Sequence, residues 1–430
     1  MVSQATINPI TALLTVLLVG MSFVVPRRRL LLPVLLAACF IPADQRFMLA
    51  DLDFPIVRVM VIAVALRLWL FNELMPVKWN AFDKLFLAWM VVGTVAYIAH
   101  WGTTGAVIFK SGQWVEIGGL YWVFRQTIRS WADVRYASVV LAACAIAITP
   151  FVFYELAAGR NLFHVLGRVS TGMRDGEYRC QASFPHSIIM GLFWAVSMPM
   201  FVGFLKQRSH TILFGLATAA SIFMIMATSS STPIMTLIVV GALVLAYKWR
   251  HQTRMATWGL VAGLVALHVV MTAPVWHLIS RVSVVSGSTG YHRYILIDRA
   301  IQHFTEWMLI GCRTTAHWGY GMTDVTNQYV VEGVHGGLAT LILFLAMLYK
   351  SARIFLHKAL QARDPKQPFL YWCLFVTVLA HAISFFGVSY FGQITFLWYL
   401  ILASAAYFNE VPVLAGLHAR RLVRYSSVPC

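Results

Sequence analysis

The sequence predicts an all-α, polytopic integral membrane protein, and three observations support this prediction. First, 60% of the 430 residues are hydrophobic and only 11% are charged, with a mean hydropathy of +0.73, whereas soluble domains carry about 25% charged residues. Second, apolar runs recur along the chain at a length close to the ~17–25 residues that a helix needs to cross a bilayer. Third, basic residues collect between alternate runs. An ordinary soluble enzyme is therefore excluded.

The basic excess has a simple explanation in a membrane protein. The net charge is +17, which in a soluble protein would suggest a nucleic-acid partner. In a membrane protein, Lys and Arg instead report sidedness, because cytoplasmic connections retain them during insertion. We therefore expect the lipid bilayer, and no nucleic acid, as a partner of this chain.

Apolar runs bounded by charged residues or by Pro and Gly clusters predict thirteen membrane-spanning helices. They cover residues 9–25, 30–43, 55–71, 85–100, 105–124, 136–153, 186–205, 211–228, 232–247, 255–274, 336–350, 368–386 and 395–410. The second run is short, so a re-entrant segment and twelve crossings remain the alternative. The stretch before the first run has no Lys or Arg, which differs from a cleaved signal peptide.

The basic clusters predict which ends of the helices share a side. The clusters at 27–29, 125–135, 248–254 and 350–366 all fall on one side of the alternation. If that side is cytoplasmic, the C-terminus lies inside and the short N-terminus lies outside. Residues 1–430 then form a single membrane domain.

Two long segments, residues 154–185 and 275–335, fall on the opposite side, and we name them the first and the second long segment. Their basic residues are all arginine: Arg160, Arg168, Arg174, Arg179, Arg281, Arg293, Arg299 and Arg313. A guanidinium group binds phosphate or carboxylate at two points, whereas an ammonium group acts as a hydrated point charge. The bias indicates oxyanion recognition. Pairing of these arginines with nearby carboxylates or lipid headgroups remains the alternative.

Polar residues beside helix starts predict where a ligand binds. In the first long segment, Arg179 and His186 flank a turn that leads directly into a helix, whose free backbone N–H groups favour an anion. The hydroxyl run at 228–233 can bind a sugar or phosphate, or can satisfy backbone groups. The second long segment contains an amphipathic helix near 291–308, with Tyr294, Ile297, Ala300, Phe304 and Met308 at helical spacing.

Taken in order, these motifs resemble the O-antigen ligase and Wzy-type O-antigen polymerase superfamily of membrane glycosyltransferases. The resemblance covers roughly residues 136–350. It rests on an Arg and Phe-Pro-His turn, a Ser-rich span, a helix begun by Arg293, a Gly-x-Gly turn and the Asp324-x-x-Asn327-x-Tyr329 element.

The resemblance implies a periplasmic-side glycosyltransferase in a bacterial inner membrane. It would use an undecaprenyl-diphosphate-linked oligosaccharide and a glycan or lipid acceptor, without cofactor or metal, beside other polysaccharide-assembly proteins. Arg179, Arg293 and Arg313 would bind the diphosphate, and Asn327 and Tyr329 would line the pocket. Arg58, one turn into its span, is a further candidate for the diphosphate.

One position departs from the family pattern. Thr326 stands where the family commonly has His, so the usual general base is absent. His317, His335 and Asp324 are the candidate replacements, because an imidazole or carboxylate can accept the proton of an acceptor hydroxyl. The missing His also keeps a non-catalytic scaffold open as an alternative.

Two further alternatives follow from the residues. A transporter or flippase of a lipid-linked or anionic solute would place ionisable residues near the bilayer midplane, whereas here they concentrate outside the predicted spans. Cys180 and Cys312 occur one in each long segment, and in an oxidising compartment they could form a disulfide.

Overall fold

The computed structural model describes residues 7–49, 52–168, 173, 176–281, 290–362 and 364–410. Within them the chain is almost entirely helical. The described strands are β1 (Arg46–Leu49) and β2 (Leu52–Pro55), an antiparallel pair in which Arg46 lies opposite Pro55. The predicted all-α class is confirmed.

Each predicted apolar run coincides with helix. The corresponding helices are α1 (Pro9–Val24), α2 (Leu31–Phe40), α3 (Ile56–Leu70), α4 (Ala81–Trp101), α5 (Thr104–Gln113), α6 (Gly119–Thr127), α7 (Trp131–Ala158), α8 (Ser187–Lys206), α9 (Thr211–Met226), α10 (Ser231–Leu245), α11 (Thr253–Val270), α15 (Gln328–Gln361), α16 (Gln367–Ser384) and α17 (Ile394–Glu410). A π-helical turn, Trp114–Gly118, joins α5 to α6.

Six helical stretches among the described residues are long and apolar enough to cross a membrane. They are Ala81–Trp101, Trp131–Ala158, Ser187–Lys206, Ser231–Val270, Gln328–Gln361 and Gln367–Ser384. The second predicted run forms α2, a helix of 10 residues whose side chains are mostly buried, so it is shorter than a spanning helix.

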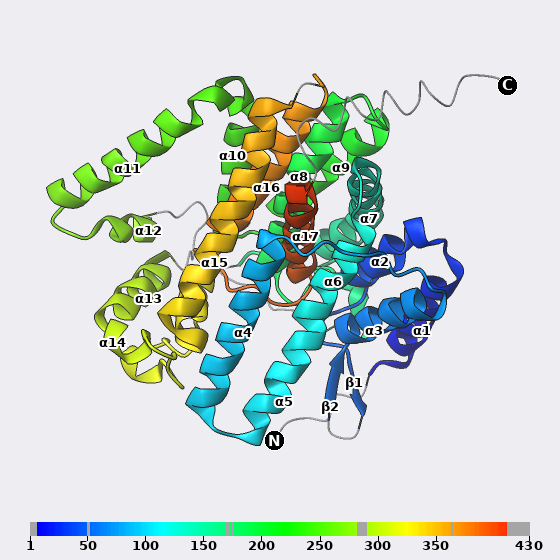
Figure 1. Ribbon diagram of the computed structural model, residues 1–430, viewed down its shortest axis with the longest axis horizontal. Helices are drawn as coiled ribbons and strands as arrows, with labels where there is room; N and C mark the ends of the chain where they lie inside the picture. Colours follow the sequence, from blue (N-terminus) through cyan, green and yellow to red (C-terminus); the bar gives the residue numbers. More distant parts are fainter. Residues whose placement is uncertain are drawn as a thin grey trace.

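The connections are sorted between the two ends of the bundle. Figure 1 shows the α10–α11 connection at the top, and the β1–β2 hairpin and the α4–α5 turn at the bottom. Helices α13 (Gly290–Gln302) and α14 (Phe304–Trp307) also lie in the lower half. This grouping agrees with the alternation of basic and Lys-poor connections in the sequence. Helix α11 stands apart from the bundle and has no buried residue.

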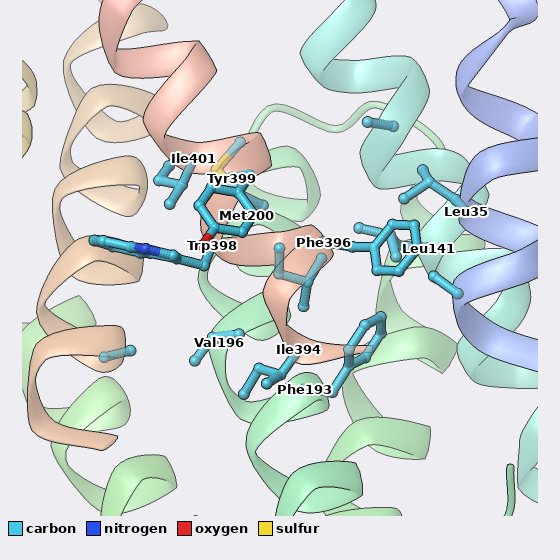
Figure 2. Packing of buried hydrophobic residues seen from close by; sticks show 14 of the residues in the cluster. Leu35, Leu141, Phe193, Val196, Met200, Ile394, Phe396, Trp398, Tyr399 and Ile401 are labelled. Atoms are coloured by element: carbon cyan, nitrogen blue, oxygen red, sulfur yellow. The ribbon is translucent and has the colours of Figure 1, made fainter. Parts of the chain in front are cut away.

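Helix α8 lies at the centre of the core. Most of its side chains are buried, and it packs against α7, α9, α10, α16 and α17. Figure 2 shows residues of both helices in one apolar cluster: Ile394 is drawn between Val196 and Phe193, whereas Phe396 points toward Leu141 and Leu35. An apolar helix that is buried all round belongs in the interior of the bundle, so α8 holds the remaining helices around it.

A buried ionic cluster fixes α4, α6 and α17 together. The Arg125 guanidinium donates to both carboxylate oxygens of Asp83, at 2.8 and 3.1 Å, and also pairs with Glu410. The Tyr121 hydroxyl donates to the same Asp83 at 2.6 Å. Arg125 is only 2% exposed and lies in the last turn of α6, so it belongs to a helix end and not to the connection that the sequence predicts there.

Helix α15 begins earlier than the sequence predicts. It starts at Gln328 instead of residue 336, because the Asn327 side chain caps it by accepting a hydrogen bond from the backbone N–H of Val330. The helix is broken at Gly337, whose φ of 75° is left-handed. The charged residues before that break therefore belong to a helix and not to a loop.

The amphipathic helix predicted near 291–308 is present, but it is interrupted and rotated. It divides at His303 into α13 and α14. The buried positions are Arg293, Leu296, Ala300 and Trp307, whereas Phe304 is exposed. The buried face is therefore rotated by about one residue from the predicted apolar face. The reason is that Leu296 and Ala300 pack with Trp307, Trp318 and Val334 in a separate small core.

Candidate functional site

A cavity of about 560 Å³ lies beside the break in α15. Its walls come from α4, α5, the first turns of α15, and the loop and helix at 385–399. Five ionisable side chains line it: Lys110, Glu116, Asp324, Glu332 and His335. Polar groups that converge in a pocket of this size are typical of a ligand site. Asp324 and His335 were predicted from the sequence.

Glu332 is the most constrained of these side chains. It is only 7% exposed, and its carboxylate accepts hydrogen bonds from the Trp89 indole N–H and the Gln328 amide, both at 2.8 Å. Gln328 is fixed in turn, because its carbonyl oxygen accepts from the backbone N–H of Tyr390 at 2.8 Å. Such a chain holds the carboxylate in one orientation toward the cavity.

The break in α15 is produced by an exchange of backbone hydrogen bonds. In a continuous helix the N–H of Leu338 would donate to the carbonyl of Val334. Here it donates to the carbonyl of Met308 at 2.8 Å, and the Val334 carbonyl accepts from the N–H of Cys312 at 2.9 Å. Residues 308–312 thus satisfy both groups, and interrupted helices in membrane proteins are tolerated where the backbone is satisfied in this way beside a cavity.

Two of the predicted arginines lie beside the hydroxyl run at the start of α10. The Arg179 guanidinium donates to the Thr228 carbonyl at 3.3 Å and to the Ser230 hydroxyl. Arg293, 9% exposed, donates from Nε to the Gly387 carbonyl at 3.2 Å. A Cβ placed on Gly387 would lie 2.7 Å from Thr232, so this loop and the hydroxyl run are in contact. The structure brings both long segments to the same turn.

The loop at 385–392 separates the cavity from Arg293. Phe385, Ser389 and Tyr390 line the cavity, whereas the carbonyl of Gly387 accepts from Arg293. Asn327 joins the same loop through its amide, which donates to the Phe386 carbonyl at 3.3 Å. Arg293 and Asn327 therefore bind adjacent peptide groups of one cavity wall.

The remaining predicted residues are dispersed. The Tyr329 hydroxyl donates to the Ala382 carbonyl at 2.7 Å, and the His186 ring caps α8 by accepting from Ile188 N–H. Arg58 pairs with the cavity residue Glu116 at 3.4 Å. Arg313 is exposed and donates to the His100 carbonyl at 2.9 Å. Arg174 lies outside the described residues.

His317 belongs to a different cluster. It does not line the described cavity, and its Nε2 contacts the Glu306 carboxylate at 2.7 Å. His303 contacts the other oxygen, Oε1, at 2.7 Å, and the Trp318 indole N–H donates at 3.1 Å to Oε2, the oxygen that His317 contacts. Hydrogen bonds from His303, His317 and Trp318 lower the pKa of Glu306 to about 2. His303, Glu306 and His317 also form a group that could hold a metal ion.

The turn of the first long segment does not present free amides to a ligand. The Glu155 carboxylate accepts from the backbone N–H groups of Gln181 and Ala182 at 3.1 and 2.9 Å. Gln181, Ala182 and Ser183 have no exposed surface. The predicted anion site uses other donors, at the start of α8, where the Ile188 N–H is already capped by the His186 ring.

The cysteines of the two long segments are not joined. Cys180 and Cys312 are both free thiols, Cys180 in the main core and Cys312 beside the small one. The possible disulfide is therefore absent from the structure. Burial raises the pKa of Cys180 to about 12 and that of Cys312 to about 11, with Glu155 and Glu306 adding to the respective shifts.

Three cavity residues were not among the predicted site residues: Lys110, Glu116 and Glu332. Lys110 lies in α5, outside both long segments. Its place in the cavity shows that the cationic groups here are not all arginine. A usable signal was present in Glu332 and His335, which stand three residues apart just before a Gly-Gly pair in an apolar stretch. That spacing puts both on one helix face.

The chain matches no protein-family model and no curated protein sequence. The function is therefore inferred from the residues and their geometry.

Proposed function

We propose that this chain is a membrane glycosyltransferase that uses a polyprenyl-diphosphate-linked glycan, as a polymerase or ligase in O-antigen or exopolysaccharide assembly. The proposal includes twelve or thirteen membrane crossings, a bacterial inner membrane and a cytoplasmic C-terminus. One observation carries it. The cavity beside the break in α15 is lined by ionisable side chains, and the buried Arg293 and Asn327 hydrogen-bond the loop that forms one of its walls.

The reaction needs three things from the protein. The bond between the anomeric carbon and the diphosphate breaks, a bond to the acceptor hydroxyl forms, and the hydroxyl proton passes to a base. Arg293 and Arg179 would bind the diphosphate, since a guanidinium presents its N–H donors in a planar fork that matches phosphate oxygens at two points. Charge stabilisation and orientation then provide most of the rate enhancement.

The cavity supplies candidates for the base. Asp324, His335 and Glu332 line it, so without a family-type His at Thr326 these groups, beside the Arg58-paired Glu116, can accept a proton. Glu332 is the candidate that the sequence did not single out. Its two fixed donors would hold it toward an acceptor hydroxyl in the cavity.

Purified protein in lipid nanodiscs, supplied with an undecaprenyl-diphosphate-linked oligosaccharide, tests the proposal. Arg293→Ala should lower the yield of longer glycan at least 100-fold, and Arg293→Lys should restore little of it, because ammonium lacks the two-point geometry. Arg299→Ala is the matched control, since Arg299 is exposed on the same helix and bonds only Gln302 among the described residues. Full activity of Arg293→Lys would contradict two-point phosphate binding.

Glu332→Gln tests the base separately. It keeps the size of the side chain and removes the proton acceptor, so glycan transfer should fall at least 100-fold, while lipid-substrate binding persists. Equal loss of binding and transfer would indicate a structural role instead. A polysaccharide profile of a deletion strain then separates the two reactions: single repeat units indicate a polymerase, and unattached long polymer indicates a ligase.

A transporter of a lipid-linked or anionic solute is the second candidate, and α15 favours it. The helix is broken at Gly337, and the buried Glu332 lies one turn before the break. Broken helices with an intramembrane carboxylate are typical of transport sites. Proteoliposomes loaded with the lipid-linked oligosaccharide decide between them, because a transporter moves the substrate across the bilayer without changing its glycan.

A further inference from the structure

The second long segment contains a cluster of metal-ligating side chains that lies outside the cavity. His303 Nδ1, a Glu306 carboxylate oxygen and His317 Nε2 all lie within 4.8 Å of one another. Each imidazole contacts a different oxygen of Glu306 at 2.7 Å. None of the three residues lines the described cavity, so their arrangement is not explained by the proposed transfer reaction.

From this geometry we propose that His303, Glu306 and His317 form a site for a divalent transition metal ion of the Zn²⁺ class. Two imidazole nitrogens and one carboxylate oxygen are a ligand set that Zn²⁺ uses, with water in the fourth position. Tetrahedral coordination at about 2.0–2.1 Å places ligand atoms about 3.3 Å apart. The observed separations, from 2.7 Å to at most 4.8 Å, reach that value by small side-chain movements.

The surrounding residues hold these side chains in place before any ion binds. The Trp318 indole N–H donates to Glu306 at 3.1 Å, and the His303 ring stacks on the Trp318 ring with an interplanar angle of 10°. Trp318 itself is 2% exposed in the small core. Groups that orient metal ligands from behind in this way commonly contribute 10–100-fold to affinity.

Access and position indicate a structural ion. The side chains of Glu306 and His317 are 38% and 50% exposed, so an ion can enter from solvent without opening the core. The ligands come from the His303–Trp307 turn and the Ala316–Trp318 turn. A bound ion would therefore link the two ends of the stretch that contains residues 308–312. These residues replace the backbone hydrogen bond between Val334 and Leu338 at the break in α15.

The full chain in detergent, freed of metal with EDTA, provides the test. Titration with Zn²⁺ against a competing chelator should give one high-affinity site per chain and raise the apparent melting temperature by several degrees. His317→Gln and Glu306→Gln should weaken Zn²⁺ binding at least 100-fold and abolish the rise in melting temperature. His251→Gln is the matched control, since His251 is exposed, lies in the turn between α10 and α11, and is not part of the cluster.

Trp318→Phe sharpens the test, because it keeps an aromatic ring and removes the N–H donor to Glu306. It should weaken Zn²⁺ binding by about 10–100-fold. If Glu306→Gln fails to fold, His317→Gln decides alone, because its ring is half exposed and its replacement disturbs the small core least. Zn²⁺ affinity that is the same in wild type, His317→Gln and His251→Gln would overturn the site. Glycan transfer does not enter this measurement, so its loss or retention leaves the result independent.

Discussion

The two long segments look alike in sequence and differ in how they are held. The first is built into the main core, where Gln181, Ala182 and Ser183 have no exposed surface and Glu155 binds its backbone amides. The second has its own small core around Leu296, Trp307 and Trp318 and joins the bundle through backbone contacts to α15. Equal richness in arginine therefore does not mean equal function.

The difference shows which arginines are available for chemistry. In the first segment, Arg168 is 4% exposed and is used internally, by Asp44 and by the Pro185 carbonyl. In the second segment, Arg299 and Arg313 are exposed. An arginine count locates a charged region, but only burial and partners separate structural cations from binding candidates.

The largest effect is expected at the contact between the second segment and α15. Gly311 has φ +90°, and a Cβ there would lie 2.1 Å from the Val334 carbonyl oxygen. Gly311→Ala should therefore cost about 4 kcal/mol, at the upper end for single substitutions, and reduce the amount of folded protein. Gly241→Ala in α10, with open space around it, should be neutral in the same thermal-melt measurement. Normal stability of Gly311→Ala would mean that the second segment is not docked as described.

Removing Glu155 tests the burial of the first segment. Glu155→Ala leaves two buried amides without an acceptor and should cost about 3 kcal/mol. The loss is measured as a lower apparent melting temperature in detergent. Glu177→Ala serves as the control, because Glu177 lies in the same segment and is exposed. Equal effects of the two substitutions would remove the distinction between the segments.

Replacing a buried arginine of the first segment should cost more stability than replacing an exposed arginine of the second. Arg168→Ala removes a buried guanidinium with two partners and should cost about 2 kcal/mol, whereas Arg313→Ala removes an exposed one and should cost about 0.5 kcal/mol. Thermal melts of both variants, prepared side by side, measure the difference. A larger loss for Arg313→Ala would reverse the assignment of structural and exposed arginines.

Thiol reactivity should show the smallest difference. Raised pKa values disfavour the thiolate, so at pH 8 both Cys180 and Cys312 should react slowly with iodoacetamide, and the rate should rise about tenfold per pH unit. With pKa values of about 12 and about 11, Cys180 should react about tenfold more slowly than Cys312, a difference of about 1.4 kcal/mol. Peptide mapping after timed alkylation resolves the two sites. Faster reaction of Cys180 would contradict its burial.

The sequence was sufficient for the helices and insufficient for their ends. Apolar runs predicted where helix would form because burial in hydrocarbon or in the core requires similar side chains along the whole run. The start of α15 at Gln328 and the break at Gly337 were missed, because they depend on a cap at Asn327 and on contacts with residues 308–312. Such contacts join stretches that no local pattern relates.

The candidate site was predicted in part for the same reason. Asp324 and His335 line the cavity, Arg179 contacts the hydroxyl run, and Arg293 contacts Gly387, which lies against that run. The hydrogen bonds that Glu155 accepts from the turn of the first long segment could not be predicted. The carboxylate lies at the end of one helix and the amides before the next, so only the fold brings them together. Their roles in glycan transfer remain predictions.

The exchange at Gly337 has an energetic consequence. If residues 308–312 withdrew, the freed carbonyl of Val334 and N–H of Leu338 would be natural partners in an uninterrupted α15. A continuous α15 would thus gain one backbone hydrogen bond and lose two, and water would hydrogen-bond the backbone groups of the withdrawn residues 308–312. The number of hydrogen bonds therefore differs little between the broken and the continuous form of α15. The stability of the broken form depends mainly on the burial of the Trp307 and Trp318 indole rings.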